Sequence, residues 1–482
     1  MKVLSVASEA FPLIKTGGLA DVVGALPSAL TGCGVEMRVF LPGYPEVLSQ
    51  VKKPPKAIKL PKVLGTEGRI LPVLVSGIDC LILDVPELFD RPGGPYTDVG
   101  GNDHADNWRR FAVFSKAAAL VADGLVPSWR PDIVHVHDWQ AALVPLYMET
   151  TGASGTPTVM TVHNLAFQGQ FDSKHFALME LEKSAFAMDG LEYYGDISYL
   201  KAGLHRAHAI TTVSPTYAQE IRTPEFGMGL EGVVNARSGD LFGIVNGIDT
   251  DIWNPASDPH IAGHFDTARR TKRKVNQKAL IEHFELDKQA KGPIFTLITR
   301  LTWQKGIDVL IESIDDIVAM GGRLAILGSG DKALEGALLG AAARHRGKFG
   351  IQLGYDEPLS HLLQAGGDAI LVPSRFEPCG LTQLYGLRYG CVPVVARTGG
   401  LADTIIDANE AALAAGVATG FQFGPVTADG LRQTVRRVIR TFDDKKTWSR
   451  IQQNGMRADV SWTRSAESYT QLYQALIEKS RT

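Results

Sequence analysis

A chain of 482 residues is too long for one ordinary hydrophobic core, so two or three domains are expected. Hydrophobic residues make up 45% and charged residues 21% of it, and the formal net charge is -3. This balance is typical of a soluble globular protein, and it leaves no basic excess to neutralise the phosphates of nucleic acid or anionic lipid. We therefore expect no nucleic-acid partner and no membrane partner.

The cysteines and the N-terminus bear on the cellular compartment. Cys33, Cys80, Cys379 and Cys391 are scattered without metal-ligand spacing, which is typical of reduced thiols. The first residues are strand-like and reach a charged, glycine-rich turn too soon for a signal peptide, and no apolar run is long enough to span a bilayer. These features predict a cytoplasmic protein.

The first half of the chain alternates apolar strands with helices. Strands are expected at 3–6 and 35–41, within 131–140, and at 158–162 and 209–213. Helices are expected at 20–30 and 107–121 and after Ser214, and a hairpin over 69–85 has Gly77 at its turn. Strands that are each followed by a helix predict a parallel, doubly wound sheet.

The second half repeats this alternation after a passage at 243–255. Strands and helices are expected at 294–298, 307–320, 324–327, 332–344, 350–353, 359–364, 369–372, 381–389 and 392–396, in that order, and a closing amphipathic helix at 465–479. In the passage, Asp249 and Asp251 could hold a divalent ion against a diphosphate, but such spacing is frequent in turns, and we favour the turn. The sequence thus predicts two doubly wound domains, with a ligand site in the cleft between them.

Two stretches of the first half carry polar groups at strand ends. Lys15, Gly17 and Gly18 follow the first strand, where glycine amides and a lysine can approach an anion, although paired glycines before a helix are also common turn chemistry. The period of two places His135 and His137 on one face of a strand that ends at Asp138. A zinc site is the less favoured interpretation because further ligands at metal spacing are lacking, and a strand end that opens onto a polar cleft is preferred.

The stretch at 374–390 has the order strand, loop, helix. Pro378 fixes the turn and Gly380 permits close backbone approach, so the N–H groups of residues 379–382 would point out of the helix start toward an anion such as a phosphate. Glu377 lies just before those donors, where the sugar of a nucleotide-sugar would lie, and a plain turn with a helix cap is the alternative. Arg300 and Lys305 follow the first strand of this half; alone they would be a solvated surface pair.

Phosphate-binding groups outnumber obvious proton donors in these stretches. This imbalance indicates a leaving group such as a nucleoside diphosphate, which is stabilised by charge and needs no protonation of the kind a glycosidase supplies.

Six motifs together resemble bacterial glycogen synthase and plant starch synthase. They are KTGGLADV at 15–22, HDWQ at 137–140, TVHN at 161–164, VNGID at 245–249, RLTWQKG at 300–306 and EPCGL at 377–381. The resemblance extends from residue 2 to the C-terminal helix. It implies an α/β protein of the GT-B fold, with two doubly wound Rossmann-like domains facing across a deep cleft.

The resemblance also implies a domain organisation and an activity. Residues 1–245 would form the acceptor (glucan) domain, residues 246–460 the ADP-glucose-binding domain, and residues 461–482 a helix crossing back to the first domain. The enzyme would move glucose from ADP-glucose to the non-reducing 4-hydroxyl of an α-1,4-glucan such as glycogen, with retention of configuration. ADP-glucose would be a co-substrate, and neither a cofactor nor a metal is expected.

Residue roles follow from the same resemblance. Arg300 and Lys305 look like the clamp on the leaving ADP, and Glu377 is similar to the carboxylate that holds the glucose hydroxyls. His163 resembles the residue that approaches the glucose ring, and Asp138 the polar residue beside it. The remaining substrate-binding positions are Lys15 and Gly18 at the lip of the diphosphate site, Tyr355 beside the adenine, and Asp21, Asn246, Cys379, Gly380, Leu381 and Thr382.

Several alternatives stay open at this point. Retention needs a carboxylate nucleophile or attack on the face of departure, and we favour same-face attack because the family motif has a histidine, His163, and not a carboxylate at this position. Rival functions are a UDP-glucose-dependent GT-B transferase, a phosphorylase with lysine-bound pyridoxal phosphate, and a non-catalytic glucan- or nucleotide-binding protein. The sequence leaves open whether the chain forms a homo-oligomer, how it is regulated, and which glucan length it prefers.

Overall fold

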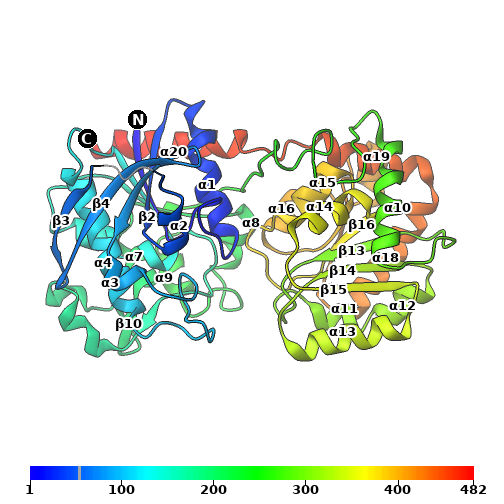
Figure 1. Ribbon diagram of the computed structural model, residues 1–482, viewed down its shortest axis with the longest axis horizontal. Coiled ribbons are helices and arrows are strands. Elements are labelled where there is room, and N and C mark those ends of the chain that lie inside the picture. Colours follow the sequence, from blue (N-terminus) through cyan, green and yellow to red (C-terminus); the bar gives the residue numbers. More distant parts are fainter. Residues whose placement is uncertain (53–55, 482) are drawn as a thin grey trace. The chain divides into compact units, whose positions relative to one another are not determined.

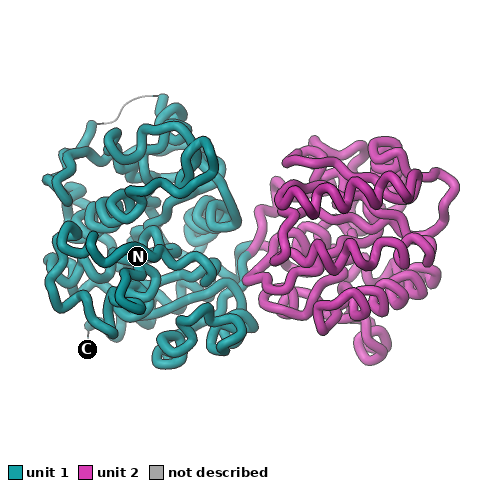
Figure 2. The backbone as a smooth tube through the Cα atoms, turned by 90° about the horizontal axis from the view of Figure 1, so that it is seen from below, with its two compact units in different colours: residues 1–246, 462–482 teal, residues 247–461 magenta. Residues whose placement is uncertain are grey.

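The protein consists of two compact units. The structure, a computed structural model, describes residues 1–52 and 56–481. The first unit contains residues 1–246 and 462–482, and the second unit contains residues 247–461 (Figure 2). The divisions expected from the sequence fall after residues 245 and 460. None of the helices in the described ranges is long and apolar enough to cross a membrane.

The first unit is built on a nine-stranded sheet with the order β12-β11-β7-β6-β1-β2-β5-β4-β3. The bounds are β1 Lys2–Val6, β2 Glu36–Pro42, β3 Ile58–Val63, β4 Thr66–Val75, β5 Ile78–Asp84, β6 Ile133–His137, β7 Thr158–Val162, β11 Ala209–Thr212 and β12 Leu241–Gly243. All pairs from β12 to β5 are parallel, as expected, and β3 and β4 add an antiparallel edge. β1 stands where the chain order reverses, with β2 on one side and β6 on the other.

The hairpin at the edge of this sheet is confirmed. β4 and β5 are antiparallel and pair from Arg69 with Asp84 to Val75 with Ile78. Ser76 and Gly77 between them both have positive φ, 50° and 81°, which suits a tight two-residue turn. A small separate sheet contains β8 Gln170–Phe171, β10 Asp196–Ser198 and β9 Glu192–Tyr193.

Some helices of the first unit begin directly after a residue that suits a helix start, such as Gly17 or the capping Ser198. The Ser214 hydroxyl accepts a hydrogen bond from the N–H of Tyr217 and so caps the helix that starts at Pro215. The helices are α1 Gly18–Thr31, α2 Pro45–Ser49, α3 Pro86–Phe89, α4 Asn107–Leu120, α5 Asp138–Ala141, α6 Val144–Met148, α7 Tyr199–Arg206, α8 Pro215–Glu220, α9 Glu231–Ala236 and α20 Thr463–Arg481.

The C-terminal helix α20 completes the core of the first unit. It lies beside α1 (Figure 1), and its buried Tyr469 and Tyr473 pack in one hydrophobic cluster with Val22, Leu26 and other residues of α1 and the sheet. The Tyr473 hydroxyl is 2.7 Å from His135 Nδ1 on β6. The last residues of the chain therefore fix a strand whose end carries predicted site residues.

The second unit has a six-stranded parallel sheet with the order β15-β14-β13-β16-β17-β18. The bounds are β13 Ile294–Ile298, β14 Arg323–Gly328, β15 Phe349–Leu353, β16 Ala369–Val372, β17 Val392–Ala396 and β18 Phe421–Phe423. This is the strand order 3-2-1-4-5-6 of a dinucleotide-binding sheet. The order reverses between β13 and β16, and open sheets bind ligands at the carboxyl ends of the strands at such a point.

Helices cover both faces of this sheet. α14 and α15 lie on one face, and α11, α12 and α13 on the other (Figure 1). The helices are α10 Arg273–His283, α11 Ile307–Ile311, α12 Ile314–Ala319, α13 Lys332–Arg344, α14 Glu357–Gly366, α15 Thr382–Tyr389, α16 Gly399–Thr404, α17 Glu410–Ala415, α18 Ala428–Asp443 and α19 Lys445–Arg457.

The single helix expected at 307–320 is wrong, because the chain forms two helices there. The break falls at Glu312 and Ser313, between α11 and α12. The Ser313 hydroxyl donates to the Val309 carbonyl at 2.8 Å, an interaction that bends helices because it draws that carbonyl away from its regular partner. The apolar spacing continues across the break, so hydrophobic periodicity alone could not reveal it.

Candidate functional site

In the second unit, two loops leave the carboxyl ends of the strands at the reversal point. The first follows β13 and contains Arg300 and Lys305, and the second follows β16 and contains Glu377. Because β13 and β16 are adjacent parallel strands, the two loops emerge side by side. The structure thus brings together two stretches that lie about 70 residues apart in the chain.

An ion pair joins these loops. Lys305 Nζ is 2.6 Å from Glu377 Oε2, which also accepts a hydrogen bond from the Ser374 hydroxyl at 2.8 Å. The two charged side chains are 16% and 11% exposed, so both charges are largely out of water. Glu377 Oε1 accepts no hydrogen bond from any residue in the described ranges. One carboxylate oxygen is therefore occupied by a cation while the other stays available.

Backbone contacts make the two loops one platform. The N–H of Arg375 donates to the Gln304 carbonyl at 2.9 Å, and its guanidinium donates to the Trp303 carbonyl and to both carboxylate oxygens of Asp308. Gly306 has a φ of 67°, and a Cβ there would lie 2.0 Å from the Pro373 carbonyl oxygen. A side chain at that position would push the loops apart, so Gly306 allows them to pack.

The start of α15 offers hydrogen-bond donors beside this ion pair. Gly380, with a φ of 72°, turns the chain from the loop into the helix. The N–H groups of Gly380, Leu381 and Thr382 donate to no described residue, as expected at a helix N-terminus. The Gln383 side chain holds the turn by donating to the Gly380 carbonyl at 2.8 Å. This turn has the donors that an anion needs.

Other predicted residues of the second unit lie at neighbouring strand ends. Arg300 is exposed, and its guanidinium makes no ion pair or hydrogen bond with the part of the chain that the structure describes. Tyr355, after β15, is 77% exposed, and its hydroxyl contacts Glu357. Cys379 is buried. Asp249 forms a turn by accepting the N–H groups of Asp251 and Ile252, which matches the favoured interpretation of that stretch.

In the first unit, Glu9 organises the loop after β1. The carboxylate is 2% exposed; Oε1 accepts the hydroxyls of Thr16 and Tyr96, and Oε2 accepts the N–H groups of Thr16 and Gly17. Lys15 on this loop pairs with Asp21 at 2.8 Å, and Gly18 begins α1. Neither Glu9 nor Tyr96 could be identified from the sequence, because each is a lone polar side chain without a spaced partner.

Asp138 and His163 meet at the ends of β6 and β7. Asp138, whose φ of 53° is in the left-handed region, accepts the N–H of His163 at 2.7 Å. His163 Nε2 is 3.1 Å from His137 Nδ1, and His137 Nε2 is 3.1 Å from the Ser5 hydroxyl on β1. Asp138 therefore stands at the reversal point of the first sheet, as expected of a strand end that binds a ligand.

Burial sets the protonation of these groups. It raises the pKa of Asp138 to about 7, against the lowering effect of the N–H groups of His163 and Asn164. It lowers the pKa of His163 to about 3, and burial with the neighbouring histidines holds the pKa of His137 well below its usual value. At neutral pH both imidazoles are neutral, and the carboxyl group is near its midpoint.

Asn246, at the end of the first unit, is 7% exposed, and its buried Oδ1 has no hydrogen-bond partner among the described residues.

Residues 1–52 and 56–481 contain no cluster of three or more histidine, cysteine, aspartate or glutamate side chains able to hold a metal ion. The less favoured zinc interpretation of His135, His137 and Asp138 gains no further ligand, since His135 Nε2 is bonded to the Thr161 hydroxyl.

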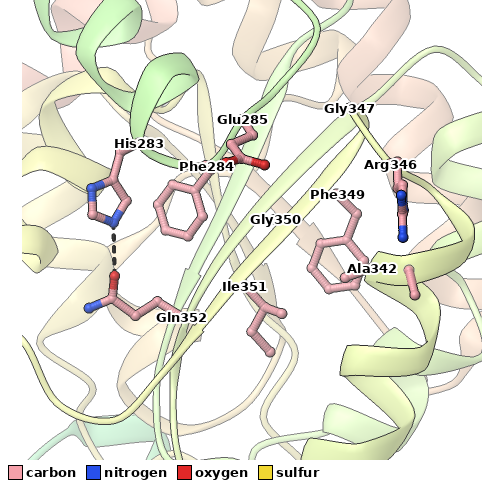
Figure 3. A pocket seen from close by; sticks show the side chains of 11 residues that line it. His283, Phe284, Glu285, Ala342, Arg346, Gly347, Phe349, Gly350, Ile351 and Gln352 are labelled. Atoms are coloured by element: carbon pink, nitrogen blue, oxygen red, sulfur yellow. Dashed lines mark hydrogen bonds between the residues drawn. The ribbon is translucent and has the colours of Figure 1, made fainter.

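The second unit also has a cavity away from the reversal point. It has a volume of about 520 Å³ and lies beside the edge strand β15, between the ends of α10 and α13 (Figure 3). His283, Glu285, Arg346 and Gln352 supply its polar lining, and His283 is bonded to Gln352. None of the residues predicted to bind substrate lines this cavity.

Known protein families and curated relatives match almost the entire chain. A family model described as starch synthase catalytic domain matches residues 2–236, and one described as glycosyl transferases group 1 matches residues 279–457. Glycogen synthase 1 of Rhizobium meliloti strain 1021 is 60% identical over 99% of this chain and 100% of its own length. Glycogen synthase of Mesorhizobium japonicum is 58% identical over 99% of each chain.

A solved structure is also similar. The catalytic domain of starch synthase IV from Arabidopsis thaliana, bound to ADP and acarbose, superimposes with a TM-score of 0.87 at 32% identity and covers 99% of both chains. The two Rossmann-like units and the matched families define a glycosyltransferase of the GT-B fold. Within that class, the chain belongs to the glycogen synthase family. The fold and the glucosyltransferase activity expected from the sequence are thereby confirmed.

The raised pKa of Asp138 predicts a pH-dependent contribution to stability. Between the ordinary value of 3.8 and the folded value of about 7 the folded state holds this proton more tightly, so the free energy of unfolding falls as pH rises through that window. Asp138→Asn removes the dependence. Its stability relative to the wild type should therefore rise from pH 4 to pH 7, by up to about 4 kcal/mol, and then level off.

Urea unfolding of both proteins across this pH range measures the effect. Asp251→Asn, at an exposed carboxylate, is the matched control for loss of a charge. A constant difference between Asp138→Asn and the wild type over the window would contradict the assignment.

Proposed function

We propose that the chain transfers glucose from ADP-glucose to the non-reducing 4-hydroxyl of an α-1,4-glucan, with retention of configuration, and so elongates glycogen. One observation carries this proposal. At the reversal point of the second sheet, the Lys305–Glu377 ion pair lies beside the free N–H donors at the start of α15, and the chain belongs to the glycogen synthase family. The starch synthase structure is bound to ADP and acarbose, a nucleotide and an oligosaccharide of the kinds proposed here.

The second unit would bind the glucosyl donor. Arg300, Lys305 and the N–H groups at the start of α15 can stabilise the negative charge that develops on the departing diphosphate. This set contains cations and amides and lacks paired carboxylates, which supports a diphosphate held without a metal ion. Tyr355 would flank the adenine, with Cys379 and its neighbours supplying backbone amides.

Glu377 would hold the sugar. Its Oε2 is paired with the Lys305 ammonium and accepts a hydrogen bond from the Ser374 hydroxyl, whereas Oε1 is free to accept a hydrogen bond from a glucose hydroxyl. Because the carboxylate is paired, it can lie beside a diphosphate without the full repulsion of two anions. Sugar orientation and leaving-group stabilisation would then depend on the same pair of side chains.

The first unit would contribute His163 and Asp138 near the transferred sugar, with Lys15, Gly18, Asp21 and Asn246 as further substrate-binding residues. A double displacement needs a carboxylate nucleophile, whereas the residue at this position is the neutral His163. This supports attack on the face from which the diphosphate departs. We further propose that the enzyme works in the cytoplasm, because none of the four cysteines, all within the described ranges, forms a disulfide and the substrate is a sugar nucleotide.

Nucleotide release tests the donor, the acceptor and the absence of a metal together. ADP release from ADP-glucose should depend on added glycogen and should persist in the presence of a chelator, while UDP-glucose should give much less product. Glycogen-dependent release from UDP-glucose alone would favour another GT-B transferase. No release from either donor would favour a binding protein, and absorbance of bound pyridoxal phosphate would indicate a phosphorylase.

Lys305→Ala tests the proposed charge stabilisation. Turnover should fall by roughly 10²–10³, the effect of losing one donor to a transition-state charge. Lys332→Ala, which removes an exposed ion-paired lysine from the same unit, should leave turnover unchanged. Steady-state ADP release gives both values, with circular dichroism to verify folding. Wild-type turnover in a folded Lys305→Ala protein would remove this lysine from the mechanism.

A further inference from the structure

Three side chains of the first unit form a hydrogen-bonded row that ends at His163. Ser5 lies on β1, His137 ends β6, and His163 follows β7, and these three strands are parallel neighbours. The Ser5 hydroxyl is 3.1 Å from His137 Nε2, and His137 Nδ1 is 3.1 Å from His163 Nε2. Both ring nitrogens of His137 are therefore engaged, one on each side.

The direction of this row depends on where the protons are. Burial keeps both imidazoles neutral, so each ring carries one N–H and one acceptor nitrogen. In one arrangement Ser5 donates to His137, which donates to His163. In the other, His163 donates to His137, which donates to Ser5, and the Ser5 proton needs an acceptor of its own.

Ser5 decides between the two arrangements. Its side chain is fully buried, and within the described part of the chain its hydroxyl has His137 as its only hydrogen-bond partner. A buried donor without an acceptor costs about 1–3 kcal/mol, which disfavours the arrangement in which the Ser5 proton is left over. The other arrangement leaves the His163 Nδ1–H unpaired among the described residues, but that ring is only half-buried, so this donor does not pay the full cost of burial. The hydroxyl therefore donates to His137 Nε2, and the single proton of His137 lies on Nδ1.

His135 does not offer a competing partner. Its ring is 4.1 Å from that of His137, centroid to centroid, but its Nδ1 is bonded to the Tyr473 hydroxyl and its Nε2 to the Thr161 hydroxyl. Both of its nitrogens are thus occupied by other groups. The row from Ser5 to His163 is independent of it.

We infer that His137, oriented by Ser5, is a positioning residue that keeps the His163 proton on Nδ1 and so makes that nitrogen a hydrogen-bond donor. Nδ1 donates to no residue in the described ranges, and it is free to donate to an oxygen of the sugar nucleotide. This inference deepens the proposed function and rests on it in one respect: the ligand that receives the hydrogen bond. The proton position itself is a property of the ligand-free protein.

The position of the proton can be measured without substrate. Long-range proton–nitrogen NMR spectra of protein labelled with ¹⁵N-histidine distinguish the two neutral forms of a ring, and the His163→Gln variant identifies the His163 signals. The wild type should show His163 protonated on Nδ1, and Ser5→Ala should keep this form, because without the Ser5 oxygen the other arrangement leaves the buried His137 Nε2–H without an acceptor. A wild-type His163 protonated on Nε2 would overturn the inference.

Kinetics test the consequence for the reaction. His137→Leu removes the donor to His163 and should lower kcat by roughly 10²-fold, as expected when a group that contacts substrate is misplaced, with a smaller change in KM for ADP-glucose. His137→Asn keeps an N–H near the position of Nδ1 and should restore most of kcat. His205→Leu removes a half-buried histidine of α7 whose Nε2 has no hydrogen-bond partner among the described residues, and it should alter neither kcat nor the His163 spectrum.

The outcomes separate this inference from the proposed function. Wild-type kcat in His137→Leu, or equal losses in the leucine and asparagine variants, would overturn the positioning role. If His137→Leu does not fold, the spectra still decide the matter, because His163 protonated on Nε2 in the wild type or in Ser5→Ala would overturn the inference. A wild type that releases no nucleotide would instead contradict the proposed function, and the proton position would stand on the spectra alone.

Discussion

The ion pair between Lys305 and Glu377 is the interaction on which the geometry of the second unit's candidate site depends. It joins loops from two adjacent strands, β13 and β16, and it is largely shielded from water. Such a pair contributes little net stability against an apolar alternative, whereas removal of one partner leaves an uncompensated charge. The pair instead holds two groups in position, because it places a carboxylate oxygen and a cation next to the free N–H groups at the start of α15.

The strand order explains why these groups can meet. In each unit the chain order reverses beside the first strand, so two loops open at the same edge without an intervening connection. The first unit uses this geometry for the Glu9-organised loop and Asp138, and the second for Lys305 and Glu377. Glu9 and Glu377 are both buried carboxylates that accept several donors, and each fixes a loop rather than standing free.

Much of this arrangement could be predicted from the sequence, because it depends on local patterns. Apolar runs defined β7, β13, β16 and β17 to the residue, and the motifs identified the family. The break at Ser313 could not be predicted, since a hydroxyl bond to the Val309 carbonyl leaves the apolar spacing intact. Short edge strands such as β12 and β18 were missed because three residues carry too little pattern, and their pairing depends on distant partners.

The sequence predicted which residues would form the candidate site, but it did not predict which of them contact one another. Lys305 and Glu377 were each expected to meet substrate, yet their contact with one another follows only from the adjacency of β13 and β16. Lys15 was expected to face an anion and in this structure pairs with Asp21, six residues away. Glu9, Ser5 and Ser374 were not identified because a single polar residue at a strand end has no distinguishing spacing.

A crystal structure of the protein with ADP would show where the diphosphate binds. We expect it at the start of α15, with its oxygens within hydrogen-bond distance of the N–H groups of residues 380–382 and of Lys305 Nζ, and with Arg300 turned toward it. A diphosphate bound elsewhere, for example in the cavity beside β15, or held through a metal ion, would contradict the account.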